Sequence, residues 1–290
     1  MPLVAARNNN ATFGRHLSPT SVLGLGDLTF EKHIDYRPWG CHMCKFLASL
    51  SNRASFPRSK FYDTTKAFVK MDVSQFAYSF LATKFFPDIV VTPPVKLLVE
   101  LDGRKIQHFR LHAPSNNVPT RRVIAWRQER EPVFASITPL FHTAYLNHGR
   151  RLYDGSGDCT NFMNRPDNVE LFQIVFLDFL FGNRDRIANC FTLSGALLLL
   201  DTGFNRGPFP QAVNYGSPSD YLAYHLERPS ICRLRHRHGI LFSNLRRFTN
   251  HSEWLSEFTP YDRHGQAFRS IQTAVHTRAR SLVSALQRCK

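Results

Sequence analysis

The feature that most constrains this chain is an apolar run in its second half. Residues 168–181 are apolar on nearly every face of a helix, the pattern of a helix buried on all sides. Asp167 is suited to cap the start of this helix, and Gly182 is suited to end it. The run is too short and too polar to span a bilayer. The sequence therefore predicts a fully buried helix here.

The segment after this helix carries two aspartates that flank a predicted hairpin. It reads Gly-Asn-Arg-Asp-Arg over residues 182–186, so the first aspartate is Asp185. Two short strands are predicted at 189–193 and 196–200, and the second leads directly into Asp201. A rigid hairpin can hold the two carboxylates about one metal–phosphate group apart.

Two carboxylates in this order suit phosphoryl transfer, and they match the catalytic and metal loops of kinase-like folds. Asp185 is the candidate acid/base that orients the acceptor hydroxyl and takes its proton. Asp201 is the candidate ligand of a divalent ion, and Asn189 could complete its site, because Mg²⁺ and Mn²⁺ prefer oxygen ligands. The structural alternative pairs Asp185 with Arg186 and makes Asp201 a strand-end residue. The complete arrangement is rarer by chance than one Asp-Arg pair, so we favour the first interpretation.

The chain before residue 139 is rich in strands, whereas the chain after it is rich in helices. A helix is predicted over 74–85, and helical periodicity returns near 235–248 and 264–288. The strands are predicted at residues 60–71, 95–101, 105–111, 123–126 and 133–137, with an Asp102-Gly103 turn between the second and the third. The sequence predicts an α+β fold with three parts: a poorly ordered segment at 1–27, a strand-rich lobe at 28–138 and a helix-rich lobe at 139–290.

A lysine in the strand-rich lobe is a candidate phosphate ligand. Lys70 ends the apolar stretch Ala67-Phe68-Val69, which is similar to the Val-Ala-Ile-Lys strand of kinases. Lys66, four residues earlier on the same predicted strand, is the alternative. Either lysine could instead be an ordinary solvated residue of a strand.

The chain has a formal net charge of +15, which favours anionic partners such as glycans, acidic proteins or phosphate-bearing ligands. A basic surface that serves only solubility accounts for the charge equally well. No nucleic-acid-binding motif accompanies the charge, and arginines interleaved with base-stacking aromatic residues are not evident. We therefore expect no specific nucleic-acid partner.

The six cysteines and two glycosylation sequons favour an oxidising compartment. The sequons begin at Asn10 and Asn250. Six cysteines allow fifteen pairings, so the residues alone leave the connectivity open. The pair Cys41 and Cys44 has no second ligand pair at a spacing suited to structural zinc. The first residues show no signal peptide or anchor, and no membrane span is expected.

Several segments resemble the four-jointed family and its relatives among the secretory-pathway kinases. The strongest resemblance is in Phe176-Leu177-Asp178-Phe179-Leu180 together with the Gly-Asn-Arg-Asp-Arg segment that follows. The similarity covers about 40–290 and is weak before residue 60. It is strong at 172–203 and at 230–248, where it includes Ser230–Arg235, and it also includes Phe61–Ala67 and Phe76–Ala82.

This resemblance implies an atypical protein-kinase-like bilobal fold and a Ser/Thr kinase that uses ATP with Mn²⁺ or Mg²⁺. It implies extracellular protein substrates such as cadherin repeats, a role of the planar-cell-polarity type, and a location in the Golgi lumen or outside the cell. The family-like positions of Cys232 and Cys289 imply a disulfide that ties the last helix to the second lobe.

The chain departs from the family at two positions. The helix of the first lobe normally offers a glutamate to the lysine or the metal, but the matching residue is Gln75, a neutral oxygen donor. Asn189 lies four residues after Asp185, where protein kinases usually have five. These departures keep a second hypothesis open, a catalytically weak kinase-fold protein that binds or regulates a partner. A third hypothesis, suggested by the basic surface, is a kinase that phosphorylates a glycan.

Overall fold

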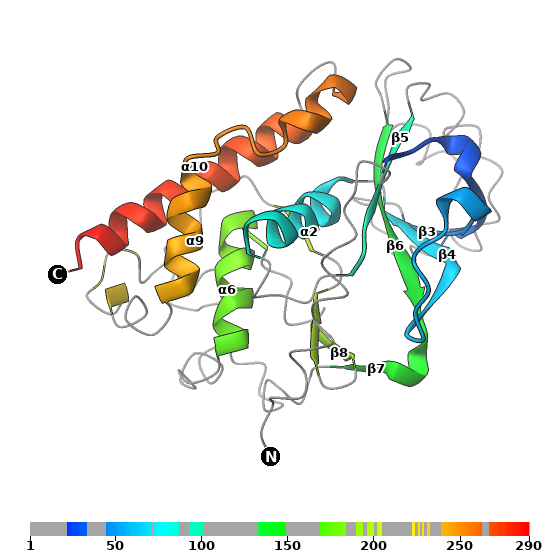
Figure 1. Cartoon of the computed structure of the whole chain (residues 1–290), viewed down its shortest axis with the longest axis horizontal. Helices are drawn as coiled ribbons and strands as arrows, with labels where there is room; N and C mark the ends of the chain where they lie inside the picture. The colour runs from blue at the N-terminus through cyan, green and yellow to red at the C-terminus, as the bar shows by residue number, and fades with distance from the viewer. Residues whose placement is uncertain are drawn as a thin grey trace.

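The computed structural model describes these parts of the chain: residues 22–33, 45–70, 72–86, 93–100, 133–148, 169–183, 190–193, 196–199, 202–204, 239–262 and 267–289, with a few positions between 222 and 232. Within them the fold is mixed α and β, with a curled six-stranded sheet on one side and helices on the other (Figure 1).

The large sheet is antiparallel except at one edge. Its strands lie in the order β1-β5-β6-β4-β3-β2, and only β1 pairs in parallel, with β5. Three shorter strands form a second sheet in the order β7-β8-β9. The strands are β1 (Val22–Leu23), β2 (Leu28–His33), β3 (Lys45–Leu50), β4 (Tyr62–Lys70), β5 (Lys96–Glu100), β6 (Val133–Phe141), β7 (Leu146–His148), β8 (Cys190–Leu193) and β9 (Ala196–Leu199).

Four α-helices and four short 3₁₀ helices complete the described elements. The α-helices are α2 (Ser74–Phe85), α6 (Val169–Phe181), α9 (Gly239–Thr249) and α10 (Ala267–Gln287). The 3₁₀ helices are η4 (Leu25–Asp27), η5 (Asn52–Ala54), η6 (Thr143–Tyr145) and η8 (Ser256–Tyr261). No helix in these parts of the chain combines the length and the apolar character that a membrane crossing requires.

Most elements predicted from hydrophobic periodicity are present. The predicted helix at 74–85 is α2, the buried helix is α6, and the hairpin after it is β8 and β9. The predicted strands at 105–111 and 123–126 lie outside the described residues. Two differences occur in the first part of the chain: β2 and β3 were not predicted, and residues 22–27, which were expected to be poorly ordered, contain β1 and η4.

The large sheet separates two hydrophobic cores. The larger core contains the apolar faces of α2, α6, α9 and α10, and the smaller one lies on the opposite face of the sheet among β2, β3 and β4. Neighbouring residues of β5 divide between them, Leu97 in the larger core and Leu98 in the smaller, as alternation along a strand requires. In α6 every side chain from residue 175 to residue 181 is buried, which confirms the predicted burial.

The helix α2 lies between the large sheet and the other helices (Figure 1). Aromatic side chains hold it there. The ring of Phe258 in η8 meets Phe76 edge to face at 4.9 Å and Phe80 at 5.2 Å between centroids. The same ring lies 5.9 Å from Phe268 at the start of α10. Edge-to-face pairs of this kind add about 0.5–1.5 kcal/mol each to the burial of their area. The 25 phenylalanines of the chain therefore serve, in part, to fix α2 in place.

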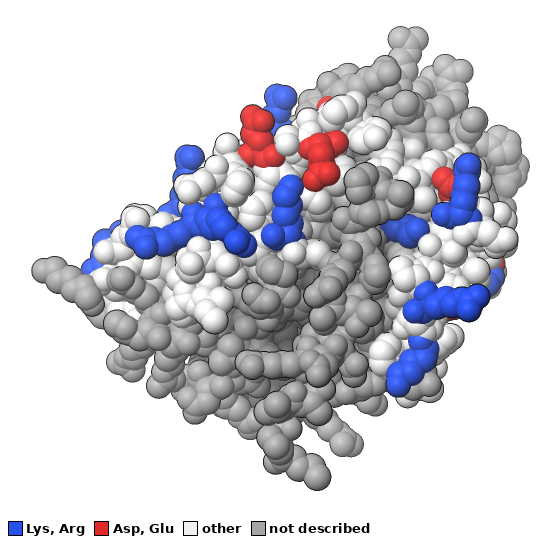
Figure 2. Space-filling view, viewed as in Figure 1, with Lys and Arg blue, Asp and Glu red and all other residues white. Residues whose placement is uncertain are grey.

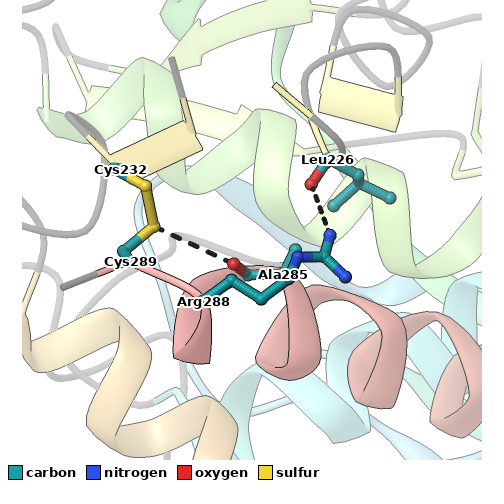
Figure 3. Close-up of a disulfide and its surroundings, with 5 residues drawn as sticks. All are labelled: Leu226, Cys232, Ala285, Arg288 and Cys289. Carbon is teal, nitrogen blue, oxygen red and sulfur yellow. Dashed lines mark hydrogen bonds between the residues drawn. A yellow bond between two sulfur atoms is a disulfide. The ribbon is translucent and has the colours of Figure 1, made fainter. Parts of the chain in front are cut away.

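A disulfide joins the end of α10 to the segment before α9. Cys289 pairs with Cys232, with 5.4 Å between their Cα atoms, which is the pairing that the family resemblance implied (Figure 3). Beside it, Arg288 donates a hydrogen bond from Nη2 to the Leu226 carbonyl at 3.3 Å. The last turn of α10 is thus attached to the body of the protein at two points.

We predict that replacing both cysteines of this disulfide by serine lowers the free energy of unfolding by about 4 kcal/mol. The bridge closes a loop with a sequence separation of 57 residues, and the chain-entropy model gives about this value for such a loop. Urea denaturation of the oxidised protein and of the double variant measures the difference. A double variant as stable as the oxidised protein would contradict the prediction.

Candidate functional site

The candidate site lies where the first turn of α2 meets residues 202–204. Thr202 is completely buried there, and both its backbone polar groups are bound by side chains. Its N–H donates to Oε1 of Gln75 at 2.7 Å. Its carbonyl oxygen accepts hydrogen bonds from Oγ of Ser74 at 2.7 Å and from Nζ of Lys70 at 3.4 Å. Three side chains near the start of α2 therefore fix the peptide groups that follow Asp201 in the sequence.

Lys70 is the last residue of β4, and its side chain is only 9% exposed. The strand ends in a tight turn in which the Asp72 N–H donates to the Lys70 carbonyl at 2.7 Å. The Lys70 ammonium lies 3.6 Å from Oδ2 of Asp72, so the cation has a carboxylate beside it as well as the Thr202 carbonyl. A buried lysine needs such partners, because transfer of a charge from water is costly.

The start of α2 is fixed by side chains from two directions. Oδ1 of Asp72 accepts a hydrogen bond from the Ser74 N–H at 2.7 Å. The Ser136 hydroxyl, on β6, accepts from the Phe76 N–H at 3.0 Å and donates to the Asp72 carbonyl at 2.7 Å. These bonds satisfy N–H groups that have no partner inside the helix. They fix the position of the first turn of α2 relative to β4 and β6.

The end of α6 shows how the chain turns towards the predicted catalytic loop. Gly182 has φ = 64°, a left-handed conformation that glycine adopts without steric cost. Its N–H donates to the Phe179 carbonyl at 3.1 Å, and the Asn183 N–H donates to the Asp178 carbonyl at 2.9 Å. This pair of bonds is the Schellman motif of a helix C-terminus. The predicted helix stop at Gly182 is confirmed.

A buried polar group connects the end of α6 to α2 and to residues 202–204. Oδ1 of Asp178 accepts hydrogen bonds from the Tyr78 hydroxyl at 3.2 Å and from Nδ2 of Asn183 at 3.0 Å. A Cβ on Gly203 would lie 3.4 Å from Oδ1 of Asn183, so these two residues are in contact distance of each other. Asp178 thus has a structural hydrogen-bonding role within the buried helix α6.

Arg278 of α10 completes the C-terminus of α6. Its Nη1 donates to the Leu180 carbonyl at 3.0 Å, across 98 residues of sequence. Helix ends leave carbonyls without partners inside the helix, and a cation at the C-terminus is favoured by the helix dipole. The last turn of α6 is therefore held by its own Schellman bonds and by an arginine from α10.

The structure distinguishes the two candidate lysines. Lys66, one-third exposed, forms an ion pair with Glu31 on β2 and a hydrogen bond of 2.9 Å to Oγ of Ser49 on β3. Hydrogen bonding to the Lys66 ammonium is the largest cause that holds the pKa of Glu31 below its usual value. Lys66 therefore belongs to a surface network of the sheet, whereas Lys70 lies against Thr202.

The other predicted site residues fall outside the described parts of the chain. These are the proposed acid/base Asp185 and the proposed metal ligands Asn189 and Asp201. Their described neighbours in sequence, Asn183 and Thr202, belong to the cluster around α2 and the end of α6. Among the described residues, no group of three or more His, Cys, Asp or Glu side chains is placed to hold a metal ion.

Sequence reasoning missed several residues that build this site. Ser136 and Arg278 bind backbone groups of distant elements, and only the fold brings them into contact. Asp72 could have been noticed, because an aspartate two residues before Ser74 is a common way to begin a helix.

Comparison with known proteins returned no match. No family model matches the chain, and it has no match among curated proteins or solved structures. Its function is therefore inferred from its residues and their contacts.

We predict that Arg278→Met lowers the free energy of unfolding by about 1–3 kcal/mol, because it leaves the Leu180 carbonyl without its charged donor. Arg280→Met is the matched control: it removes the same charge from an exposed position on the same helix and should change stability by less than about 0.5 kcal/mol. Urea denaturation of both variants makes the comparison. Equal effects of the two substitutions would show that the contact with α6 contributes nothing.

Proposed function

We propose that this chain is an ATP-dependent protein serine/threonine kinase with an atypical, bilobal kinase-like fold. The observation that carries the proposal is the position of Lys70: at the end of a strand, against the residue that follows Asp201. Protein kinases hold ATP phosphates with a strand lysine and bind the metal ions through an aspartate of a later loop. Contact between these two parts of the chain is what such a mechanism requires.

The order of the elements also supports a kinase-like arrangement. Three consecutive antiparallel strands, β2, β3 and β4, end at Lys70, and α2 follows directly. Two more strands, β5 and β6, complete the sheet before the chain reaches α6 and the hairpin of β8 and β9. A kinase places its lysine on the third strand and its catalytic and metal loops in the following lobe. The boundary predicted after residue 138 falls within β6, so the first lobe would extend to the end of that strand at Phe141 and the second would follow it.

The chain's own residues divide the chemistry as follows. ATP with Mn²⁺ or Mg²⁺ would supply the phosphoryl group and a divalent charge. Lys70 suits a phosphate, because its ammonium lies against the carbonyl of Thr202, the residue that follows the proposed metal ligand Asp201 in the sequence. Asp201 and Asn189 would hold the ion. Asp185 would orient the acceptor hydroxyl and take its proton.

We further propose that the acceptors are extracellular protein domains, such as cadherin repeats, and that the protein works in the Golgi lumen or outside the cell, in signalling of the planar-cell-polarity type. The Cys232–Cys289 disulfide is compatible with an oxidising compartment. The sequon residue Asn250 is exposed just after α9, as a glycosylation acceptor must be.

A catalytically weak kinase-fold protein is the second candidate, and Gln75 is the observation that favours it. Its carboxamide is buried, carries no charge and is bound to the Thr202 N–H. A protein of this kind would keep the fold and bind a partner without efficient transfer.

A glycan kinase is the third candidate, favoured by the basic surface. Lys and Arg side chains gather over α9 and α10 in Figure 2. Exposed arginines on these helices include Arg246, Arg247, Arg269 and Arg280. Neither helix contains an aspartate or a glutamate, so an anionic glycan would meet no opposing charge from them.

We predict that Mn²⁺-ATP raises the thermal unfolding midpoint of the protein and that Lys70→Ala abolishes most of this increase. A ligand that binds only the folded state stabilises it by mass action, and removal of the phosphate ligand weakens that binding. Lys66→Ala is the matched control, because it removes a lysine from the same strand but from its surface network. Loss of the increase in the Lys66 variant alone would move the assignment to Lys66.

We predict that Asp185→Asn and Asp201→Asn fail in different ways. Asp185→Asn should keep Mn²⁺-ATP binding and lower the transfer rate by about 10²–10⁴, the usual cost of losing an acid/base group. Asp201→Asn should lose both transfer and metal-dependent binding, because the ion neutralises phosphate charge. Radiolabel transfer to a cadherin-repeat fragment and to a proteoglycan linker sugar measures the rates and separates the candidates. Nucleotide binding without transfer to either acceptor would favour the catalytically weak protein.

A further inference from the structure

Lys70 has a carboxylate partner, although the helix position that usually supplies one holds a glutamine. We propose that Asp72 is this partner: a positioning residue that holds the Lys70 ammonium in the site in place of a glutamate on α2. The inference rests on the proposed kinase function for its meaning, but the pairing itself can be tested without any kinase activity.

The two oxygens of Asp72 have different roles. Oδ1 accepts the Ser74 N–H at 2.7 Å, which fixes the side chain at the start of α2. Oδ2 is buried, has no hydrogen-bond partner among the described residues and lies 3.6 Å from Nζ of Lys70. The second oxygen is therefore directed at the ammonium by the bond that the first one makes.

Burial makes this pair stronger than a surface ion pair. The side chains of Lys70 and Asp72 are 9% and 22% exposed. Exposed ion pairs contribute little because water screens them, whereas charges at low exposure are screened less. Each of the two charges would also be costly to bury alone.

Gln75 cannot serve as the partner, because its groups are used elsewhere. Its Oε1 accepts the Thr202 N–H at 2.7 Å, and its Nε2 lies 3.5 Å from Oγ of Ser79. A carboxamide also carries no charge to balance an ammonium. The connection between β4 and α2 is short, so the acidic residue comes three positions earlier, in the turn itself. Asp72 thus balances the charge of Lys70, whereas Gln75 binds the backbone of Thr202.

The test begins with Asp72→Asn, which keeps an oxygen to accept the Ser74 N–H but removes the charge. Asp63→Asn is the matched control. Asp63 lies on β4, and its Oδ1 accepts the N–H of the residue two positions later, Thr65, at 2.8 Å, just as Oδ1 of Asp72 accepts the Ser74 N–H. Each change is combined with Lys70→Met in a double-mutant cycle followed by urea unfolding. We expect a coupling of about fivefold in the unfolding equilibrium constant for Asp72 with Lys70, and none for Asp63.

Additive effects in the Asp72 cycle would overturn the pairing. The Asp72→Asn protein could also fold only when Lys70 is changed to Met as well. That result would be an extreme form of the same coupling and would support the pairing. This measurement uses no nucleotide, so it decides the pairing even if the protein proves to have no kinase activity.

Nucleotide affinity tests the positioning role. Asp72→Asn should weaken Mn²⁺-ATP binding about tenfold, and Asp63→Asn should not change it. Gln75→Glu should recover part of the loss in the Asp72→Asn protein, because it returns a carboxylate to a side chain that contacts Thr202, as Lys70 does. An Asp72→Asn protein with unchanged nucleotide affinity would overturn the positioning role, whereas a native protein that binds no nucleotide would overturn the kinase proposal instead.

Discussion

The hydrogen bonds to the backbone of Thr202 are the interactions on which the rest of the site depends. Thr202 is fully buried, so its N–H and carbonyl would each cost about 1–3 kcal/mol if they had no partner. Gln75 and Ser74 satisfy them from α2, and Lys70 contributes from β4. The cost of breaking these bonds keeps a strand, a helix and a distant loop at fixed positions. The proposed chemistry needs those three elements together.

The two hydrophobic cores explain why α2 can hold this position. Its aromatic residues pack against η8, whose Phe258 also contacts α10, so the helix is fixed on the side away from the sheet. Ser136 fixes its first turn from β6. The end of α6 is fixed in a comparable way, by Asp178, Asn183 and Arg278. Polar bonds therefore set the geometry at the helix ends, while apolar packing supplies most of the stability.

Elements with strong periodicity could be predicted from the sequence, and contacts between distant residues could not. The α6 pattern and Gly182 indicated both the helix and its end, because these depend on neighbouring residues. Lys70 could be named as a candidate, but its contact with Thr202 spans 132 positions and is created by the fold. β2 and β3 were not predicted; in β3 burial alternates strictly along Lys45–Leu50, but the apolar Leu47 occupies one of the less buried positions and hides this alternation in the sequence. The roles of Asp185, Asn189 and Asp201 remain predictions.

The central claim is that Lys70 and the two aspartates share one nucleotide site. The measurement that tests it most directly is a crystal structure of the protein with ATP and Mn²⁺. The account predicts that the Lys70 ammonium contacts a phosphate, that Asp201 binds the metal ion, and that Asp185 opens onto the same cleft next to the terminal phosphate. Nucleotide bound away from Lys70, or Asp185 and Asp201 on opposite faces of the protein, would contradict it.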